Sequence, residues 1–400
     1  MLLPGNRRRN VAAAPMPERP APTINMSRGR SAWLIVNLRV RGRSVRQRTH
    51  RFPHPGRSAR IHAMRTLIKR LAWAMLVGGC SVGVVAVGAA ATDGAAALER
   101  SACEPVERPD FQRYRDRQLA TLRGEQTAAR AQNLPIREVG DPNRDLGTEA
   151  DYLARNAPGV RCERIVYVSD GLRIRGYLWT PARLPVGKKL PLIVFNRGGT
   201  GDDSKLRANT QFGFERFVRA GYAVIGSQYR GNDGSEGVDE VGGSDVRDVL
   251  RLTTLARDLP FVDARNIFAV GYSRGAMMTL AALRDGASFN AVALVGLPAD
   301  FRAPAFDRSF ARMEGDAAAA RAQRSAITFA EKIDAPVLML QGSGDPLVSV
   351  ATQTLPFVAR MQSLRKTYEL VIYDGDSHGL IFNGVDRDDR VLAWFARFTR

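Results

Sequence analysis

The sequence predicts an α/β fold: a mostly parallel sheet of about eight strands, with helices on both faces and a small helical insertion. Continuous apolar runs such as Leu190–Phe195 and Tyr222–Ser227 are typical of strands that are buried on both faces. These runs alternate with helix-forming segments of about 10–15 residues, as parallel strands joined by crossover helices require. The alternation therefore predicts one α/β domain over residues 161–400.

Residues 92–160 form a polar lead-in, mainly helical because good helix formers fill Asp110–Asn133. Leu172–Thr180 alternates after the turn-forming pair Asp170–Gly171, which predicts an antiparallel hairpin at one sheet edge. The expected strands are 164–168, 172–180, 190–195, 222–227, 266–270, 291–295, 336–341 and 368–373. The expected helices are 110–133, 211–220, 244–259 capped by Ser244, 274–284, 351–364 and 386–399, with Pro298–Asp334 as the irregular helical insertion.

The net charge of +19 is concentrated at the N-terminus. Residues 1–63 contain 14 arginines and one acidic residue, and residues 64–91 add three basic residues and no acidic one. Residues 92–400 carry a net charge of only +3. The folded part is nearly neutral, so its charge does not indicate a nucleic-acid partner.

Residues 64–91 have the layout of a secretory signal peptide. A short cationic stretch after Met64 leads into an uncharged apolar run that ends in three alanines, 89–91. Met64 is then a candidate true start, and residues 1–63, which are biased to Arg and Pro, would be a disordered or mistranslated extension. We therefore expect an exported protein, periplasmic or secreted.

Three alternatives to a cleaved signal remain open. Residues 71–91 are long enough to span a bilayer, so they can attach the protein to the membrane as a retained anchor. Val77–Cys80 resembles a lipoprotein cleavage box, and the whole run can also be a buried core helix.

Two cysteines, Cys103 and Cys162, remain after the signal-like segment. In an oxidising compartment such a pair can form a disulfide, which would tie the lead-in to the first strand. Two unpaired small hydrophobic side chains are the equal alternative. Cys and His are not clustered in a metal-binding pattern, so the sequence predicts neither a metal site nor a cofactor.

Gly271–Gly275 (GYSRG) matches the Gly-x-Ser-x-Gly pattern of a nucleophile elbow. The motif follows an expected strand and opens an expected helix, and this setting is more specific than the string itself. Gly271, Tyr272 and Gly275 would shape the turn, and Ser273 would be the nucleophile above the sheet. This pattern predicts a serine hydrolase on the α/β-hydrolase fold.

The general base is almost forced, because His378 is the only histidine after residue 62. It follows the strand at 368–373, at the sheet edge where catalytic groups gather. Asp345 lies between Ser273 and His378 in the chain order of this fold, which makes it the expected acid of the triad. Asp374 and Asp376 are rivals that more naturally shape the histidine loop.

The expected oxyanion hole takes one backbone N–H from Arg274, the residue after the nucleophile. The second N–H should come from the loop after the strand at 190–195, with Arg197 the expected donor and Gly198 the alternative. The adjacent glycines of this loop would let its backbone approach a substrate, although they can also mark a plain turn.

Over residues 164–400 the chain resembles the catalytic domain of the prolyl oligopeptidase family of serine peptidases. The resemblance implies Ser273, Asp345 and His378 as the triad and cleavage of small peptides or amides. Large members of the family have an N-terminal β-propeller, which residues 92–160 are too few to build. The loop at 196–199 also replaces the more usual His-Gly-Gly-Pro. The resemblance rests on these blocks: Asp170–Gly171, Tyr229–Gly234, Gly243–Asp248, Gly271–Ala276, Ile333–Pro336, Asp345–Val348 and His378–Gly379.

The leading expectation is hydrolysis through an acyl-enzyme, with a small peptide, amide or ester as the partner. The absent propeller keeps a carboxylesterase acting on small acyl esters as an alternative. A non-catalytic binding scaffold on the same fold is the remaining one.

Overall fold

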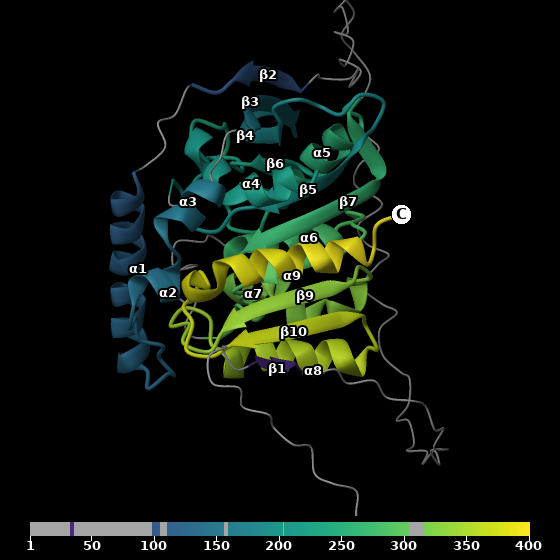
Figure 1. Cartoon of the computed structure of the whole chain (residues 1–400). Coiled ribbons are helices and arrows are strands. Elements are labelled where there is room, and N and C mark those ends of the chain that lie inside the picture. Colours follow the sequence, from purple (N-terminus) through teal and green to yellow (C-terminus); the bar gives the residue numbers. More distant parts are fainter. Residues whose placement is uncertain (1–32, 36–97, 105–109, 156–158, 203, 304–315) are drawn as a thin grey trace, which may run out of the picture. The chain divides into compact units, whose positions relative to one another are not determined.

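A computed structural model describes residues 33–35, 98–104, 110–155, 159–202, 204–303 and 316–400 (Figure 1). All of these belong to one unit of the chain. The signal-like segment at 64–91 lies outside the described residues. So do residues 1–63, except for the short strand 33–35. Within the described part, no helix has both the length and the apolar character needed to cross a membrane.

The described chain contains a ten-stranded sheet with the order β1-β10-β9-β8-β7-β5-β6-β4-β3-β2. Six neighbouring strands run parallel to one another: β6, β5, β7, β8, β9 and β10. The pairs outside them, at both edges of the sheet, are antiparallel. The strands are β1 (Trp33–Ile35), β2 (Glu99–Ala102), β3 (Val160–Ser169), β4 (Leu172–Pro181), β5 (Leu190–Asn196), β6 (Ala223–Ser227), β7 (Val262–Tyr272), β8 (Val292–Val295), β9 (Val337–Gly342) and β10 (Tyr368–Tyr373).

The predicted α/β-hydrolase fold is confirmed, and β3–β10 are its eight expected strands. The hairpin β3–β4 turns at Asp170 and Gly171, which both have positive φ angles (51° and 78°), as a tight two-residue turn requires. The short strands β1 and β2 extend the two sheet edges. The sequence did not reveal them because three or four residues are too few to show a period.

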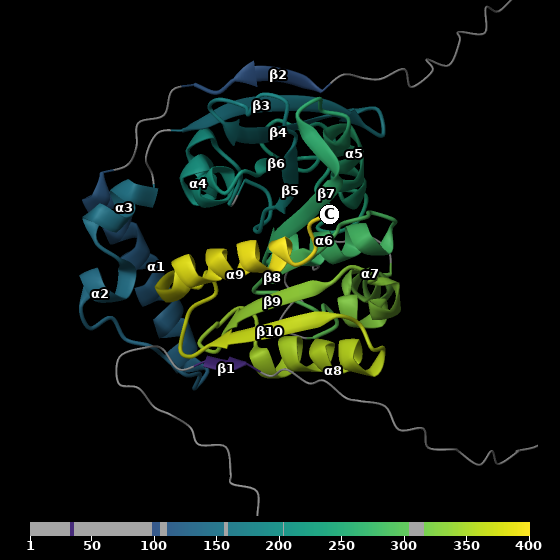
Figure 2. The ribbon, with the colours of Figure 1, turned by 45° about the vertical axis from the view of Figure 1, so that its right-hand side comes forward.

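Helices cover both faces of the sheet (Figures 1 and 2). In β5, Leu192 and Val194 pack into one apolar cluster with α5, α6 and α8, whereas Ile193 and Phe195 pack into the other with α4 and α9. This alternation explains why β5 reads as an unbroken apolar run. The helices are α1 (Phe111–Ala131), α2 (Pro142–Leu146), α3 (Glu149–Arg155), α4 (Gln211–Arg219), α5 (Val246–Arg257), α6 (Arg274–Arg284), α7 (Ala317–Arg324), α8 (Leu355–Ser363) and α9 (Gly384–Ala396).

The lead-in helices lie beside the carboxyl ends of β9 and β10, and Figures 1 and 2 agree on this placement of α1 and α2. The helix predicted over 110–133 is α1, which begins after Asp110, whose side chain accepts a hydrogen bond from the backbone N–H of Arg113. Of the predicted insertion Pro298–Asp334, residues 304–315 lie outside the described part. The remainder forms α7 and two single 3₁₀ turns.

Ser244 does not cap α5, which was a wrong prediction. The helix begins at Val246, and the hydroxyl of Ser244 donates instead to the carboxylate of Glu240 at 2.5 Å. The residue directly before α5 is Asp245, so Ser244 lies one position too early for its hydroxyl to accept an N–H of the first helical turn. The expected helix 351–364 is also shorter, because a π-helical turn, Val350–Thr354, precedes α8.

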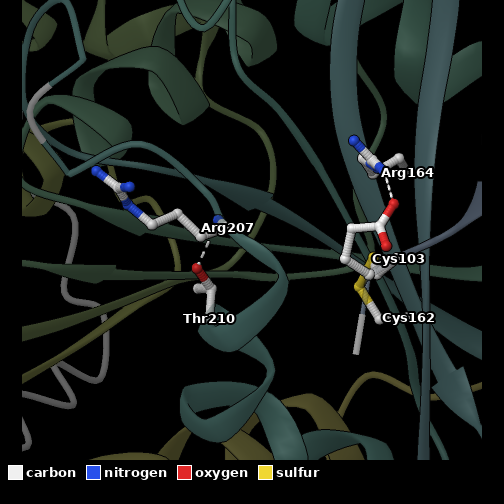
Figure 3. The surroundings of a disulfide bond; sticks show 6 residues. Cys103, Cys162, Arg164, Arg207 and Thr210 are labelled. Carbon is white, nitrogen blue, oxygen red and sulfur yellow. Dashed lines mark hydrogen bonds and ion pairs between the residues drawn. A yellow bond between two sulfur atoms is a disulfide. The ribbon is translucent and has the colours of Figure 1, made fainter. Parts of the chain in front are cut away.

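Cys103 and Cys162 form a disulfide in the structure, with their Cα atoms 5.5 Å apart (Figure 3). The bridge joins the segment after β2 to β3, and the backbone N–H of Cys103 also donates to the carbonyl of Cys162 at 3.2 Å. Beside it, the guanidinium of Arg164 pairs with Glu104 at 2.9 Å.

Candidate active site

Ser273 occupies the turn between the end of β7 and the start of α6. Its backbone angles, φ 52° and ψ −121°, lie in a region that a residue with a side chain adopts only at a cost. The backbone N–H of Ser273 donates to the carbonyl of Val295 in β8 at 2.8 Å, which helps to hold this conformation. The turn therefore presents the hydroxyl at the carboxyl edge of the sheet.

The two outer glycines of the elbow are required because their surroundings leave no room for a side chain. A Cβ on Gly271 would lie 2.6 Å from the Cα of Ala276, and a Cβ on Gly275 would overlap the carbonyl oxygen of Asn196. Real Cβ atoms do not approach other atoms so closely, so any other residue would push α6 away from the ends of β5 and β7. The glycines of the motif are thus explained by packing.

The structure brings His378 and Asp345 together. His378 Nδ1 lies 2.7 Å from Asp345 Oδ2, and Asp345 is almost fully buried. The other oxygen of Asp345 accepts the backbone N–H groups of Leu347 and Val348 at 2.8 and 2.9 Å. The carboxylate is therefore fixed in place by its own loop, and it can fix the tautomer and orientation of the imidazole.

The two rival carboxylates do not contact the imidazole. Asp376 is buried and accepts from the side chain of Asn383 at 2.7 Å and from the backbone N–H of Ser377, also at 2.7 Å. Asp374 is exposed and accepts a long bond from Ser343 at 3.4 Å. Both shape the loop, and the triad role of Asp345 remains the prediction that this geometry favours.

His378 has a raised pKa. Burial by itself would lower the pKa of the imidazole, but the hydrogen bond to Asp345 and the negative charges of Asp345 and Glu125 outweigh that effect. The base is therefore stronger than an ordinary histidine while its side chain stays mostly buried.

The ring of His378 lies on the backbone of Gly296, directly after β8. A Cβ at Gly296 would come 2.7 Å from Cε1 and 2.9 Å from Nδ1 of the ring. Gly296 follows Val295, whose carbonyl accepts the N–H of Ser273. Since Nδ1 is engaged by Asp345, Nε2 is the nitrogen left for Ser273.

Ser273 and His378 both lie in the described part of the chain, and no hydrogen bond joins the hydroxyl to the imidazole there. Catalytic hydrogen bonds often lengthen in a free enzyme and tighten once substrate is bound. The structure therefore places the ring on the strand next to the elbow, and the hydrogen bond itself stays a prediction.

The predicted oxyanion loop lies against the elbow. A Cβ at Gly198 would be 3.1 Å from the carbonyl of Tyr272 and 3.3 Å from the Cβ of Ser273. Arg274 is the first residue of α6, where a backbone N–H has no acceptor within the helix. The loop and the start of α6 thus lie side by side at the elbow, where the two oxyanion donors are expected.

The two arginine side chains of this region have structural roles. The guanidinium of Arg274 is buried and pairs with Asp239 at 2.5 Å and with Asp245 at 2.6 Å. The guanidinium of Arg197 donates to the carbonyl of Gln228, and the hydroxyl of Tyr229 donates to the carbonyl of Arg197 at 3.1 Å. These contacts hold the oxyanion loop and the start of α6 together.

Tyr229 lies between the two guanidinium groups, whose central carbons are 5.2 Å (Arg197) and 4.9 Å (Arg274) from its ring centre. Cations over an aromatic face are attracted by the ring. Its backbone has a φ of 66°, the left-handed region. The family-like blocks of the sequence include Tyr229 and Asp245, but the sequence gave no signal for Asp239, which lies outside those blocks.

Residues 209–400 match the family model described as "Prolyl oligopeptidase family". The matched part, just under half of the chain, is similar to this family. The match includes Ser273, Asp345 and His378, and the predictions of the family and of a serine peptidase of this type are confirmed.

Curated relatives of the chain carry peptidase names. The chain is 28% identical over 230 residues to the "Uncharacterized peptidase YtmA" of Bacillus subtilis, which covers 55% of this chain and 86% of that protein. It is 26% identical over 282 residues to "Uncharacterized peptidase YuxL" of the same organism, which covers 64% of this chain and 42% of that one.

Solved structures of similar fold include the acylaminoacyl peptidase of Pyrococcus horikoshii, with a TM-score of 0.54 and 20% identity. The match covers 66% of this chain and 44% of that one. A puromycin-hydrolyzing peptidase of Mycobacterium tuberculosis has a TM-score of 0.52 and 23% identity, over 59% of this chain and 39% of that one. The chain thus spans less than half the length of both, and the likeness is one of fold.

A cavity of about 1090 Å³ adjoins the loop of His378. Gly379 and Leu380 line it on the side of the base, and Tyr114 of α1 and Tyr152 of α3 line it on the side of the lead-in. Arg387 of α9 also lines it and lies with its guanidinium carbon 5.2 Å from the ring centre of Tyr272. The lead-in helices therefore form part of the wall of the space beside the loop of His378.

Proposed function

We propose that the chain hydrolyses peptide or amide bonds of short substrates through an acyl-enzyme on Ser273. The observation that carries the proposal is the 2.7 Å contact between His378 Nδ1 and Asp345 Oδ2, next to the strained elbow. A buried carboxylate that fixes an imidazole beside a serine elbow is the arrangement that activates a hydroxyl for attack on a carbonyl.

In the proposed reaction, His378 Nε2 takes the proton from Ser273 as the hydroxyl oxygen attacks the substrate carbonyl carbon. The N–H of Arg274 and one N–H of the loop at 197–198 bind the oxyanion that forms. The imidazolium then gives its proton to the leaving amine, and the carbon–nitrogen bond breaks. Water, deprotonated by the same imidazole, releases the acyl group and restores Ser273.

The cavity supports a preference for short substrates. Its volume of about 1090 Å³ is close to the upper end for a small-ligand pocket, and residues of α1 and α3 line one side of it. The relatives that carry peptidase names favour an amide bond over an ester.

A panel of short aminoacyl amides and peptides, assayed beside acyl esters of matched side chains, tests the proposal. Wild type should cleave amides, and Ser273→Ala should cleave neither class. Cleavage of esters alone would make the chain a carboxylesterase and overturn the peptidase proposal. A folded wild type that hydrolyses no member of the panel and binds it unchanged would favour a non-catalytic scaffold.

We further propose that the protein is exported, with residues 64–91 as signal peptide or, alternatively, residues 71–91 as membrane attachment. The signal-like sequence supports this, and so does the disulfide Cys103–Cys162, since such bonds persist in oxidising compartments. Cell fractionation with N-terminal sequencing tests it. A mature end near residue 92 is expected, whereas an intact, cytosolic Met64 end would contradict export.

A further inference from the structure

The lead-in segment contacts both loops that carry the acid and the base. The backbone N–H of Arg137 donates to the carbonyl of Gly375 at 3.0 Å, three residues before His378. The side chain of Gln132 donates to the carbonyl of Pro346 at 3.0 Å, directly after Asp345. The segment after α1 is thus hydrogen-bonded to each catalytic loop.

The two loops pack on the backbone of this segment without space between them. A Cβ at Gly375 would lie 2.8 Å from the carbonyl carbon of Ile136, and a Cβ at Gly344 would lie 2.5 Å from the carbonyl oxygen of Pro135. Close packing of this kind transmits position, so the lead-in fixes where the two loops lie.

Glu125 of α1 makes the direct contact with the base. Its Oε2 accepts the backbone N–H of His378 at 2.8 Å. Leu122 and Ala129, three residues before and four after it, are buried, so Glu125 lies on the face of α1 that packs inward. Burial raises the pKa of the Glu125 carboxyl, and the N–H and charge of His378 partly oppose that shift.

The charged groups that act on the imidazole come from two elements. Asp345 contributes from the loop after β9, and Glu125 contributes from α1. Asp376, in the loop of His378 itself, is turned to its own backbone and to an amide side chain. Arg137 lies with its guanidinium carbon 4.5 Å from the ring centre of Phe382, and it pairs with Asp145 at 3.4 Å.

We propose that Glu125 is a positioning residue of the active site. Its carboxylate holds the backbone of His378, and its negative charge stabilises the imidazolium that forms as Ser273 gives up its proton. The catalytic consequence rests on the proposed function. Glu125 lies outside residues 209–400, so the family match assigns it no role.

Two substitutions separate the two parts of this role. Glu125→Gln keeps an oxygen that can accept the N–H of His378 but removes the charge. Glu125→Ala removes both. Glu138→Gln is the matched control, because Glu138 is an exposed carboxylate of the same lead-in that pairs only with Arg130 at the surface.

The first readout does not depend on hydrolysis. The imidazole of His378 is titrated by NMR, and its signal is assigned by its loss in His378→Ala. Removal of a nearby negative charge favours the neutral imidazole, so Glu125→Gln should lower the pKa of His378, whereas Glu138→Gln should leave it unchanged. An unchanged pKa in Glu125→Gln would overturn the electrostatic part.

The second readout is kinetic and uses the substrate that wild type cleaves best. Glu125→Gln should move the acidic limb of kcat/KM to lower pH, and Glu125→Ala should lower kcat about tenfold with little change in KM. Wild-type kcat in a folded Glu125→Ala would overturn the positioning role. If Glu125→Ala does not fold, the acidic limb of kcat/KM in Glu125→Gln tests the role instead, and an unshifted limb would overturn it. Failure of wild type to hydrolyse anything would instead contradict the proposed function and leave the NMR result to judge Glu125.

Discussion

The imidazole of His378 rests on the backbone of Gly296, with Cε1 2.7 Å from the point that a Cβ of that glycine would occupy. Gly296 continues β8 directly beside the turn that carries Ser273, because the preceding residue accepts the N–H of Ser273. The position of the ring is thus set by the lack of a side chain at Gly296, directly after β8, and by the carboxylate of Asp345, in the loop after the neighbouring strand β9.

Gly296→Ala should therefore displace the ring of His378 and lower kcat/KM by about a hundredfold or more, since small misplacements of a catalytic group have such effects. Both Gly296 and Gly286 have positive φ angles, 60° and 102°, so an alanine is strained at either position. A Cβ at Gly286 meets nothing within 4 Å, which makes Gly286→Ala the control for strain alone. Equal activities in the two variants would contradict the ring placement.

The pH dependence of kcat/KM should show an acidic limb above the ordinary histidine pKa of 6.5. Only neutral His378 can accept the proton of Ser273, and the folded protein holds the pKa of this residue above its usual value. Activity is therefore lost as the pH falls through that raised pKa. A limb below 6.5 in the wild type, measured with a neutral substrate, would contradict the charge arrangement.

Asp245→Asn should destabilise the protein by about 3–5 kcal/mol, because it leaves the buried guanidinium of Arg274 without one of its two carboxylate partners. Asp334→Asn removes the exposed carboxylate that pairs with the half-buried Lys366, and it should cost less than about 1 kcal/mol. Denaturant unfolding of the two variants and wild type measures the difference. Equal stabilities would mean that the pair with Asp245 does not hold the elbow in place.

Loss of the disulfide should lower stability while leaving the active site intact. The bridge closes a loop over a sequence separation of 59, for which the entropy model gives about 4 kcal/mol. The double variant Cys103→Ser with Cys162→Ser should therefore unfold at lower denaturant and keep its kcat at low temperature. This account of the bridge is wrong if the double variant unfolds at the same denaturant concentration as the wild type. It is also wrong if the folded variant loses its kcat.

The sequence predicted local features accurately where strong short-range signals exist. The structure places α6 at the predicted bounds Arg274–Arg284 and β10 at Tyr368–Tyr373, because a glycine-bounded elbow and a flanked apolar run fix their ends. The capping of α5 by Ser244 failed, because the helix begins at Val246 and Asp245 holds the position directly before it. Local propensity does not fix a helix end to a single residue.

Long-range contacts carried no sequence signal at all. Glu125 is one acid among several on a polar helix, and only the folded chain shows that it accepts the N–H of His378, 253 positions away. Asp239 and Asp245 likewise lie in a glycine-rich loop, and their pairing with Arg274 depends on how that loop folds over α6. The three triad residues could be predicted from the sequence because the fold constrains their chain order and their positions relative to strands.

The most direct test of the central claim is covalent labelling with a fluorophosphonate, read by intact mass and peptide mapping. The claim that His378 activates Ser273 predicts one adduct, on Ser273, in the wild type, with no adduct in Ser273→Ala and much slower labelling in His378→Ala. A folded wild type that stays unlabelled, or equal labelling of wild type and His378→Ala, would contradict it.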